Sequence, residues 1–252
     1  MNKIMVGDSA IKLKQLPDAS VDLTVTSPPY DGLRTYNGYS FDFEAIAREL
    51  YRVTKLGGVV VWVVADSTIK GSESGTSFRQ ALFFKEIGFN LHDTMIYAKK
   101  NYIPLTHNRY EQAFEYMFVF SKGRPKTFNG ARIPSEQITG GAKFFEADGS
   151  QRKQHSVSGV KEDKLKSNMW FYGTGGNRNG HPATFPLQLP LDHIASWSNP
   201  GDVILDPFLG SGTTGEAAVR LGRNFVGIEI SREYIDIAYP RIIQAKNEVS
   251  GG

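Results

Sequence analysis

The stretch Val203-Ile-Leu-Asp-Pro-Phe-Leu-Gly-Ser-Gly-Thr-Thr214 decides the fold, because an apolar run passes through a glycine turn into a helical pattern. Its first three residues are typical of a buried parallel strand. Gly210 and Gly212 let a ligand approach the backbone, and the following helix offers unpaired N–H groups. The loop lacks the lysine of a P-loop and the three-glycine spacing of a dinucleotide site. It therefore predicts a strand–loop–helix unit that binds another kind of ligand.

Similar short apolar runs predict the other strands of a parallel sheet, at 3–6, 22–26, 59–64 and 225–230. Helical patterns lie between them, at 43–54, 77–87 and 213–221. This alternation predicts an α/β fold with a doubly wound, mostly parallel sheet. Two runs without a helix between them, 94–98 and 116–120, predict an antiparallel edge. Residues 186–197 are expected to form a further helix.

Composition narrows the class of protein. The chain has 252 residues, of which 40% are hydrophobic and none is cysteine. Disulfides, thiolate zinc sites and cysteine nucleophiles are therefore excluded. The five histidines form no HExxH motif, so no metal site is expected. The longest apolar run, Val59 to Ala65, is too short to cross a membrane, and no signal peptide precedes it. We expect a soluble, cytoplasmic protein.

Positive charge is concentrated in residues 121–180, which hold eleven Lys or Arg against five Asp or Glu. The same segment contains ten of the 26 glycines and shows weak periodicity. Such composition fits an inserted module that faces a polyanion, and it equally fits a solvated loop. We expect residues 1–120 and 181–252 to form one domain around an inserted basic region, 121–180.

Two acidic residues are placed to hold a nucleoside. Glu229 ends the strand that follows the glycine loop, nineteen residues after Gly210. A carboxylate at that position is suited to the two ribose hydroxyls. Asp206, at the end of the preceding strand, would face a positively charged or amino group. Together with the loop, these carboxylates favour binding of an adenosyl group.

A stiff turn, Ser27-Pro28-Pro29-Tyr30, follows the strand at 22–26. Two prolines fix two φ angles and exclude Ser27 from helical conformation. The turn can aim the Ser27 hydroxyl and the Pro28 carbonyl at one point, with the Tyr30 ring beside them. These acceptors and this ring suit a planar base that carries an exocyclic amino group. The alternative is a turn that only stiffens the loop.

These motifs resemble the amino-group DNA methyltransferases, in the permuted subgroup (beta class) in which the catalytic turn precedes the cofactor loop. Residues 26–30 resemble the catalytic motif, and residues 205–214 resemble the S-adenosylmethionine loop. Residues 181–186 are similar to a motif at the methionine end, and residues 7–9 to one at the adenine ring. The resemblance implies a Rossmann-like sheet with one antiparallel strand, in which the strand at 3–6 lies beside the strand at 225–230.

The resemblance also implies cofactor, partner and site residues. S-adenosylmethionine would be held by Asp8, Ser9, Thr184, Phe185, Asp206, Phe208, Gly210, Ser211, Gly212, Thr213 and Glu229. The basic segment becomes the target-recognition region for double-stranded DNA. Its expected DNA contacts are Lys122, Arg124, Lys126, Arg132, Arg152, Lys153, Lys166 and Arg178. A homodimer is expected, with neither membrane nor metal as a partner.

Serine at the start of the turn favours cytosine N4 as the methylated atom of a flipped-out base, because adenine-N6 relatives usually carry an acidic or amide residue there. Adenine N6 is the alternative, since Ser27 can serve both bases. Methylation of cytosine C5 is excluded because it requires a cysteine. Two other functions stay open: a methyltransferase for RNA or a protein amide, and a non-catalytic nucleic-acid-binding subunit.

Overall fold

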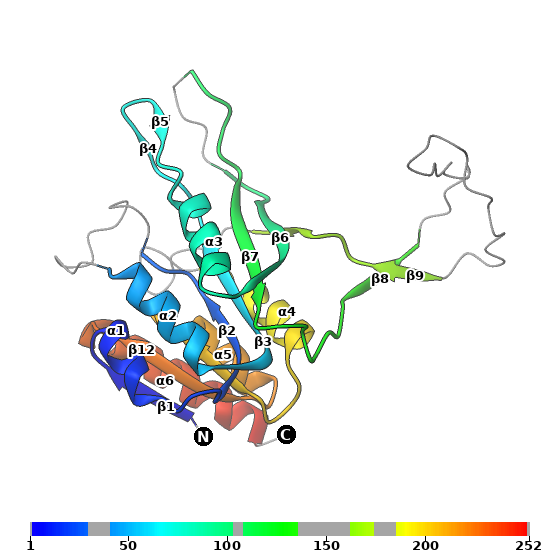
Figure 1. Cartoon of the computed structure of the whole chain (residues 1–252). Helices are drawn as coiled ribbons and strands as arrows, with labels where there is room; N and C mark the ends of the chain where they lie inside the picture. The colour runs from blue at the N-terminus through cyan, green and yellow to red at the C-terminus, as the bar shows by residue number, and fades with distance from the viewer. Residues whose placement is uncertain (1, 30–40, 103–107, 136–161, 174–184, 251–252) are drawn as a thin grey trace. The chain divides into compact units, whose positions relative to one another are not determined.

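The computed structural model describes residues 2–29, 41–102, 108–135, 162–173 and 185–250 (Figure 1). The chain divides into two compact units. One unit consists of residues 1–129 and 168–252, and the other of residues 130–167. The expected insertion was wider, because residues 168–173 include a strand of the main sheet.

The first unit is built on one eight-stranded sheet with the order β1-β12-β11-β2-β3-β7-β6-β10. In that order the strands are β1 (Asn2–Val6), β12 (Asn224–Glu229), β11 (Val203–Asp206), β2 (Val21–Thr26), β3 (Thr54–Val64), β7 (Phe114–Ser121), β6 (Asn90–Lys99) and β10 (Met169–Tyr172). Only β7 runs antiparallel to its neighbours in this sheet. The predicted doubly wound, mostly parallel sheet with one antiparallel strand is confirmed.

Two details of the strand order had been predicted from the sequence. The strand β1 pairs with β12 in register from Asn2 opposite Phe225, as the resemblance implied. The antiparallel pair β6 and β7 was expected at the edge of the sheet, and this expectation was wrong. The strand β10 adds to β6 in parallel and forms the edge instead. Its four residues were too short a signal within the glycine-rich segment.

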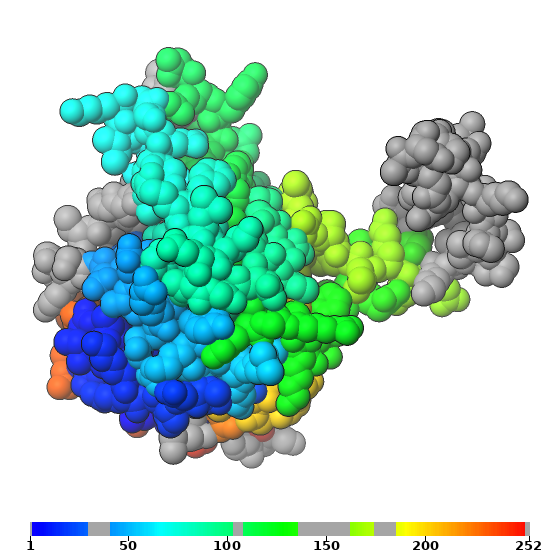
Figure 2. Space-filling view, in the orientation of Figure 1, coloured from blue at the N-terminus to red at the C-terminus, as the bar shows by residue number. Residues whose placement is uncertain are grey.

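Helices cover both faces of the sheet (Figure 1). Figure 2 shows the surface on the side of α2 and α3, in blue to cyan. One face carries α1 (Ser9–Lys12), η1 (Leu13–Gln15), α2 (Phe43–Val53) and α3 (Thr76–Glu86). The other carries α4 (Gln188–Trp197), α5 (Thr213–Arg220) and α6 (Arg232–Ser250). Each layer encloses an apolar core, centred on Trp62 and Phe84 on the first face and on Ile194 and Phe225 on the second. The short strands β4 (Thr68–Ile69) and β5 (Ser72–Glu73) form a hairpin after β3.

The helix α6 was not predicted, because Pro240 lies inside it and proline normally disrupts a helix interior. The periodic signal is nevertheless present: Ala238, Ile242 and Ala245 are buried at helical spacing. Among the described residues, no helix combines the length and the apolar character needed to cross a membrane.

The positions of the helices define where the sheet changes winding direction. From β11 the chain passes through α5 to β12 on one side, and from β2 it passes through α2 to β3 on the other. The two helices lie on opposite faces, so the carboxyl ends of β11 and β2 diverge at a topological switch point. Open α/β sheets bind their ligands at such a crevice.

The second unit contains one antiparallel hairpin, β8 (Arg132–Pro134) with β9 (Asp163–Leu165). The Arg132 guanidinium binds both carboxylate oxygens of Asp163, at 2.6 and 2.7 Å. The backbone N–H of Lys166 also donates to the carbonyl of Ala131. These contacts close the described part of the unit around the two strands.

Candidate active site

Glu229, the last residue of β12, receives hydrogen bonds from the loop beside it. The Gly210 N–H donates to Oε2 at 2.8 Å, and the N–H groups of Ile230 and Ser231 donate to Oε1 at 2.9 Å. The side chain is buried. A carboxylate has about four acceptor positions, so three donors leave capacity for a ligand hydroxyl. The structure thus joins Glu229 to the glycine loop through Gly210.

Asp206 lies at the end of β11, across the switch point from β2. Its Oδ1 accepts the Thr26 hydroxyl at 2.7 Å and the Phe208 N–H at 3.0 Å. Burial raises the pKa of Asp206 to about 6, and the charge of Glu229 adds to the rise against these donors. An ionised Asp206 is therefore favoured by a nearby cation.

The segment after β1 joins the same edge of the sheet. Asp8 begins α1 by accepting the Ile11 N–H at 3.1 Å. The buried Ser9 hydroxyl donates to the Pro207 carbonyl at 2.5 Å, which ties this segment to the loop after β11. Residues from β1, β12 and β11 therefore meet at one place, as the motif order implied.

The glycine loop is fixed from behind by α6. Gly210 and Gly212 have φ angles of +50° and +84°, and Gly212 begins α5. The Arg241 guanidinium binds the buried Glu216 carboxylate and contacts the Thr213 hydroxyl at 3.0 Å. It also reaches the Ser211 carbonyl at 3.3 Å and hydroxyl at 3.4 Å. The side chains of Ser211 and Thr213 thus support the loop through α6.

The Ser27-Pro28-Pro29 turn extends β2 at the same edge. Thr26 pairs with Trp62 of β3, and Pro28 is buried while Ser27 and Pro29 are half-buried. Phe208, two residues after Asp206, packs edge-on against Phe41 with ring centroids 5.3 Å apart. Because Thr26, directly before the turn, donates to Asp206, the turn and the loop after β11 are neighbours across the switch point.

Several predicted residues cannot be placed. Tyr30, Arg152, Lys153, Arg178 and Thr184 lie outside the described residues. Phe185 is described; it is half-buried and packs against the core between the sheet and α4 to α6.

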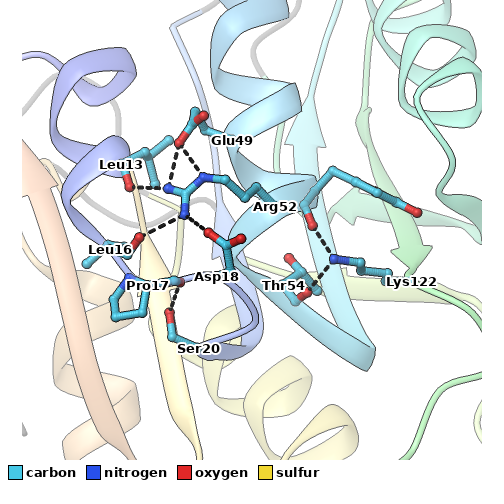
Figure 3. A network of polar contacts seen from close by, with 10 residues as sticks. Leu13, Leu16, Pro17, Asp18, Ser20, Glu49, Arg52, Thr54 and Lys122 are labelled. Carbon is cyan, nitrogen blue, oxygen red and sulfur yellow. Dashed lines mark hydrogen bonds and ion pairs between the residues drawn. The ribbon is translucent and has the colours of Figure 1, made fainter.

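The structure places Lys122, Arg124 and Lys126 where the parallel strands of the sheet begin, which we call the amino edge. The carboxyl edge is the opposite side, where β11 and β12 end at Asp206 and Glu229. The three basic residues follow β7, which is antiparallel, so they lie beside the amino end of β3. Backbone bonds from Gly57 N–H to the Lys122 carbonyl and from Lys126 N–H to the Gly57 carbonyl fix this position. The Lys122 ammonium donates to the carbonyls of Tyr51 and Thr54, at 2.7 and 2.9 Å (Figure 3). This environment favours a structural role for Lys122 rather than the expected contact with DNA.

Sequence reasoning missed Asp66, which follows β3 at the carboxyl edge. This buried carboxylate accepts the Ser74 hydroxyl at 2.9 Å, the Ser77 N–H at 3.0 Å and the Ser77 hydroxyl. Burial alone would raise the pKa of Asp66, but these donors together hold it below the usual range. Asp66 fixes the β4–β5 hairpin against the start of α3. An acidic residue after an apolar run, followed by serines, was the available signal.

The carboxylates at this site fit S-adenosylmethionine. Its ribose offers two hydroxyls, and its methionine end carries positive charges. The site places Glu229, Asp206 and Asp8 at the carboxyl ends of three adjacent strands, β12, β11 and β1. In the part of the chain that the structure describes, no group of His, Asp and Glu side chains is arranged to hold a metal ion.

Comparison with known proteins agrees with this arrangement. The family model for DNA methylases that modify N6 or N4 amino groups matches residues 21–240. The orphan methyltransferase M.BamHII of Bacillus amyloliquefaciens is 52% identical over 241 residues, which cover 91% of each chain. The DNA adenine methyltransferase YhdJ of Escherichia coli K12 is 30% identical, over 95% of this chain and 82% of its own.

Solved structures show the same fold. A DNA modification methylase of Thermus thermophilus, TTHA0409, in complex with S-adenosyl-L-methionine, has a TM-score of 0.67 at 26% identity and covers 98% of this chain and 96% of its own. The cytosine-N4-specific PvuII DNA methyltransferase has a TM-score of 0.71 at 22% identity, over 100% of this chain and 93% of its own, which supports the fold alone. The chain belongs to the N4/N6 amino-group DNA methyltransferases, which use S-adenosylmethionine.

Proposed function

We propose that this methyltransferase modifies the N4 amino group of cytosine in a base flipped out of double-stranded DNA. The observation that carries the proposal is Ser27, which opens the Pro-Pro turn at the switch point, directly after Thr26, whose hydroxyl donates to Asp206. S-adenosylmethionine, when bound, supplies an electrophilic methyl group.

The chain's own residues would prepare the amine. Its lone pair is conjugated with the ring, so the nitrogen is a poor nucleophile. The Ser27 oxygen and the Pro28 carbonyl would accept hydrogen bonds from its two N–H groups and favour a pyramidal nitrogen with an exposed lone pair. Most of the acceleration would come from holding the two reactants in line. Tyr30 would stack on the flipped base.

The cofactor assignment rests on Glu229 and Asp206, with Asp8, Phe185 and Phe208 alongside. Glu229→Ala should weaken S-adenosylmethionine binding roughly 10- to 100-fold, since it removes a charge-assisted hydrogen bond to a ribose hydroxyl. Calorimetry on the folded fraction measures this effect. Glu233→Ala, which removes an exposed carboxylate from the first turn of α6, is the matched control. Equal affinity in Glu229→Ala and wild type would defeat the assignment.

Adenine N6 is the second candidate, because the relative YhdJ is an adenine methyltransferase. The serine hydroxyl can accept an amino proton and donate to a ring nitrogen, which is N3 in cytosine and N1 in adenine. The physical argument therefore permits both bases. Serine at the start of the turn, a pattern more usual in cytosine-N4 relatives, favours cytosine.

Nucleoside analysis distinguishes the two bases. DNA methylated by the purified enzyme is digested and its nucleosides are resolved by mass spectrometry. N4-methylcytosine is the expected product, and Ser27→Ala should abolish it while cofactor affinity is retained. N6-methyladenine as the sole product would overturn the base assignment and leave the reaction class intact. Parallel assays on RNA test the competing substrate class, and absence of methyl transfer would support the non-catalytic interpretation.

The second unit is proposed as the DNA-recognition region. Lys164 is exposed on the described hairpin, and Lys166 follows the same strand. Replacing both lysines by alanine leaves the Arg132–Asp163 ion pair intact. The replacement should reduce the salt dependence of DNA binding by about 0.9 log units for each lost phosphate contact. An unchanged slope would identify this region as a solvated loop. The expected homodimer is likewise a proposal, tested by light scattering.

A further inference from the structure

One hydrogen bond crosses the switch point of the sheet. The hydroxyl of Thr26, the last residue of β2, donates to Oδ1 of Asp206, the last residue of β11, at 2.7 Å. Thr26 is completely buried, and Asp206 is 2% exposed. The helices that follow these two strands leave on opposite faces of the sheet. This bond therefore links the half of the sheet that carries Ser27 to the half that carries the cofactor loop.

A second threonine on β2 shows that the strand does not require a paired hydroxyl. Thr24 lies two residues earlier on the same face and is also completely buried. Its hydroxyl has no hydrogen-bond partner within the described residues. Burial of threonine in β2 is thus compatible with an unpaired oxygen. The pairing of Thr26 with a carboxylate is a feature of this position.

We propose that Thr26 is a positioning residue whose hydroxyl fixes the Asp206 carboxylate for the positively charged end of S-adenosylmethionine. The same Oδ1 accepts the Phe208 N–H, so the carboxylate is held from β2 and from its own loop. This inference rests on the proposed role of Asp206 in cofactor binding. It adds a residue from the catalytic half of the sheet to the cofactor site.

The charge state of Asp206 makes the proposal measurable. Burial is the largest influence on the pKa of Asp206 and raises it. Among the charged side chains of the described residues, only Glu229 of the neighbouring β12 raises this pKa further. Thr26, the Phe208 N–H and Thr214 oppose burial by donating to the carboxylate. With a pKa of about 6, Asp206 titrates close to neutral pH. Loss of one donor should raise this pKa further and weaken binding of a cation.

The test compares Thr26→Val, Thr26→Ser and Thr24→Val. Affinity for S-adenosylmethionine is measured by calorimetry between about pH 5 and 9. Wild-type affinity should rise with pH as Asp206 ionises. In Thr26→Val we expect about tenfold weaker binding of S-adenosylmethionine near pH 6.5. The midpoint of the rise in affinity with pH should move upward by about one pH unit. Thr26→Ser should restore both values, and Thr24→Val should leave both unchanged.

Several outcomes would overturn the proposal. They are a wild-type pH profile in Thr26→Val, an equal shift in Thr24→Val, and wild-type affinity that does not depend on pH. If Thr26→Val does not fold, Thr26→Ala replaces it. Calorimetry near pH 6 in buffers of different ionisation enthalpy should then show that cofactor binding releases more protons in Thr26→Ala than in the wild type, and equal release would overturn the proposal. All these readouts omit DNA. A failure to find N4-methylcytosine would therefore reject the proposed target while leaving this inference standing.

Discussion

The carboxyl edge and the amino edge of the main sheet differ in the charged side chains that hold their loops. At the carboxyl edge, the acidic side chains of Glu229, Asp206 and Asp66 accept hydrogen bonds from backbone N–H groups. Helices begin at this edge, and their first N–H groups lack partners within the helix. Asp66 completes such a bond for Ser77 in the first turn of α3. Asp206 and Glu229 instead accept N–H groups of the loops that lead into α5 and α6.

At the amino edge, basic side chains donate to backbone carbonyls. Lys122 binds two carbonyls at the end of α2, and Arg52 binds the carbonyls of Leu13 and Leu16 at 2.9 Å (Figure 3). Arg223 donates to the carbonyls of Leu221 and Ser198, after α5 and α4. Exceptions are Asp22, which accepts the Val203 N–H at the amino edge, and Arg241, which reaches the Ser211 carbonyl at the carboxyl edge. A charged residue in this fold therefore has to be placed at one of the two edges before a function is inferred from its charge.

The glycines give the largest expected difference between the edges. Gly212 at the carboxyl edge and Gly201 at the amino edge have nearly equal φ angles, +84° and +88°. A Cβ at Gly212 would lie 2.9 Å from Ala238 Cβ, whereas a Cβ at Gly201 would meet nothing within 4 Å. We expect Gly201→Ala to cost about 1–2 kcal/mol of unfolding free energy from backbone strain alone. Gly212→Ala should cost about 4 kcal/mol, since overpacking is added.

Denaturant unfolding of both glycine variants measures the difference directly. Equal losses would show that the contact between the loop and α6 yields without cost. The presence of glycine at position 212 would then be explained by the close approach of a ligand to the loop, without a contribution from packing against α6.

Arg52 provides the next largest effect. Its guanidinium binds two carbonyls and the carboxylates of Asp18 and Glu49, with about a quarter of the side chain exposed. Arg52→Met should lower the free energy of unfolding by about 3 kcal/mol, because partly buried acceptors lose a charged donor. Cofactor affinity of the folded protein should be unchanged. Arg48→Met, on the exposed side of α2, is the control; an equally small loss in both variants would contradict this assignment.

Replacement of Asp206 at the carboxyl edge should stabilise the protein, whereas replacement of Arg52 should destabilise it. The pKa of Asp206 in the folded state, about 6, lies above the ordinary value of 3.8, so the folded state holds a proton that the unfolded state has lost between these values. Stability therefore falls as pH rises from about 4 to about 6 and is level above. Asp206→Asn should remove this fall and raise the free energy of unfolding at pH 7.5 by about 2 kcal/mol, while cofactor affinity drops. Thermal unfolding across this pH range decides; a less stable variant at pH 7.5 would contradict it.

Sequence reasoning succeeded where local chemistry and strand order agree. The glycine loop, Glu229 and the Pro-Pro turn are legible because each motif stands at the end of an apolar strand, and parallel strands bring their ends to one edge. The helix α6 was missed because Pro240 contradicts its local pattern, although its buried face is regular. The strand β10 was missed because pairing with β6, a long-range event, creates it.

The basic segment shows why charge counts cannot locate a surface. Lys122, Arg124 and Lys126 belong to the same positive stretch as Arg132 and are adjacent to it in sequence. Their edge is set by the direction of β7, which no local pattern in the sequence specifies. Thr26 illustrates the reverse case: it stood inside a motif, but its partner is 180 residues away.

Lys122 therefore supplies the smallest and most discriminating test. Its ammonium caps the carbonyl end of α2 and lies 4.5 Å from the centroid of the Tyr51 ring. Lys122→Met keeps the apolar stem and removes the charge, so we expect a loss of about 1 kcal/mol in unfolding free energy. The salt dependence of DNA binding should stay at the wild-type slope, because the amino edge lies opposite the proposed active site. Arg124→Met, an exposed neighbour with no capping role expected, should change neither quantity. If Lys122→Met instead flattens the salt slope by about 0.9 log units at unchanged stability, the amino edge contacts phosphate and the division of roles between the two edges fails.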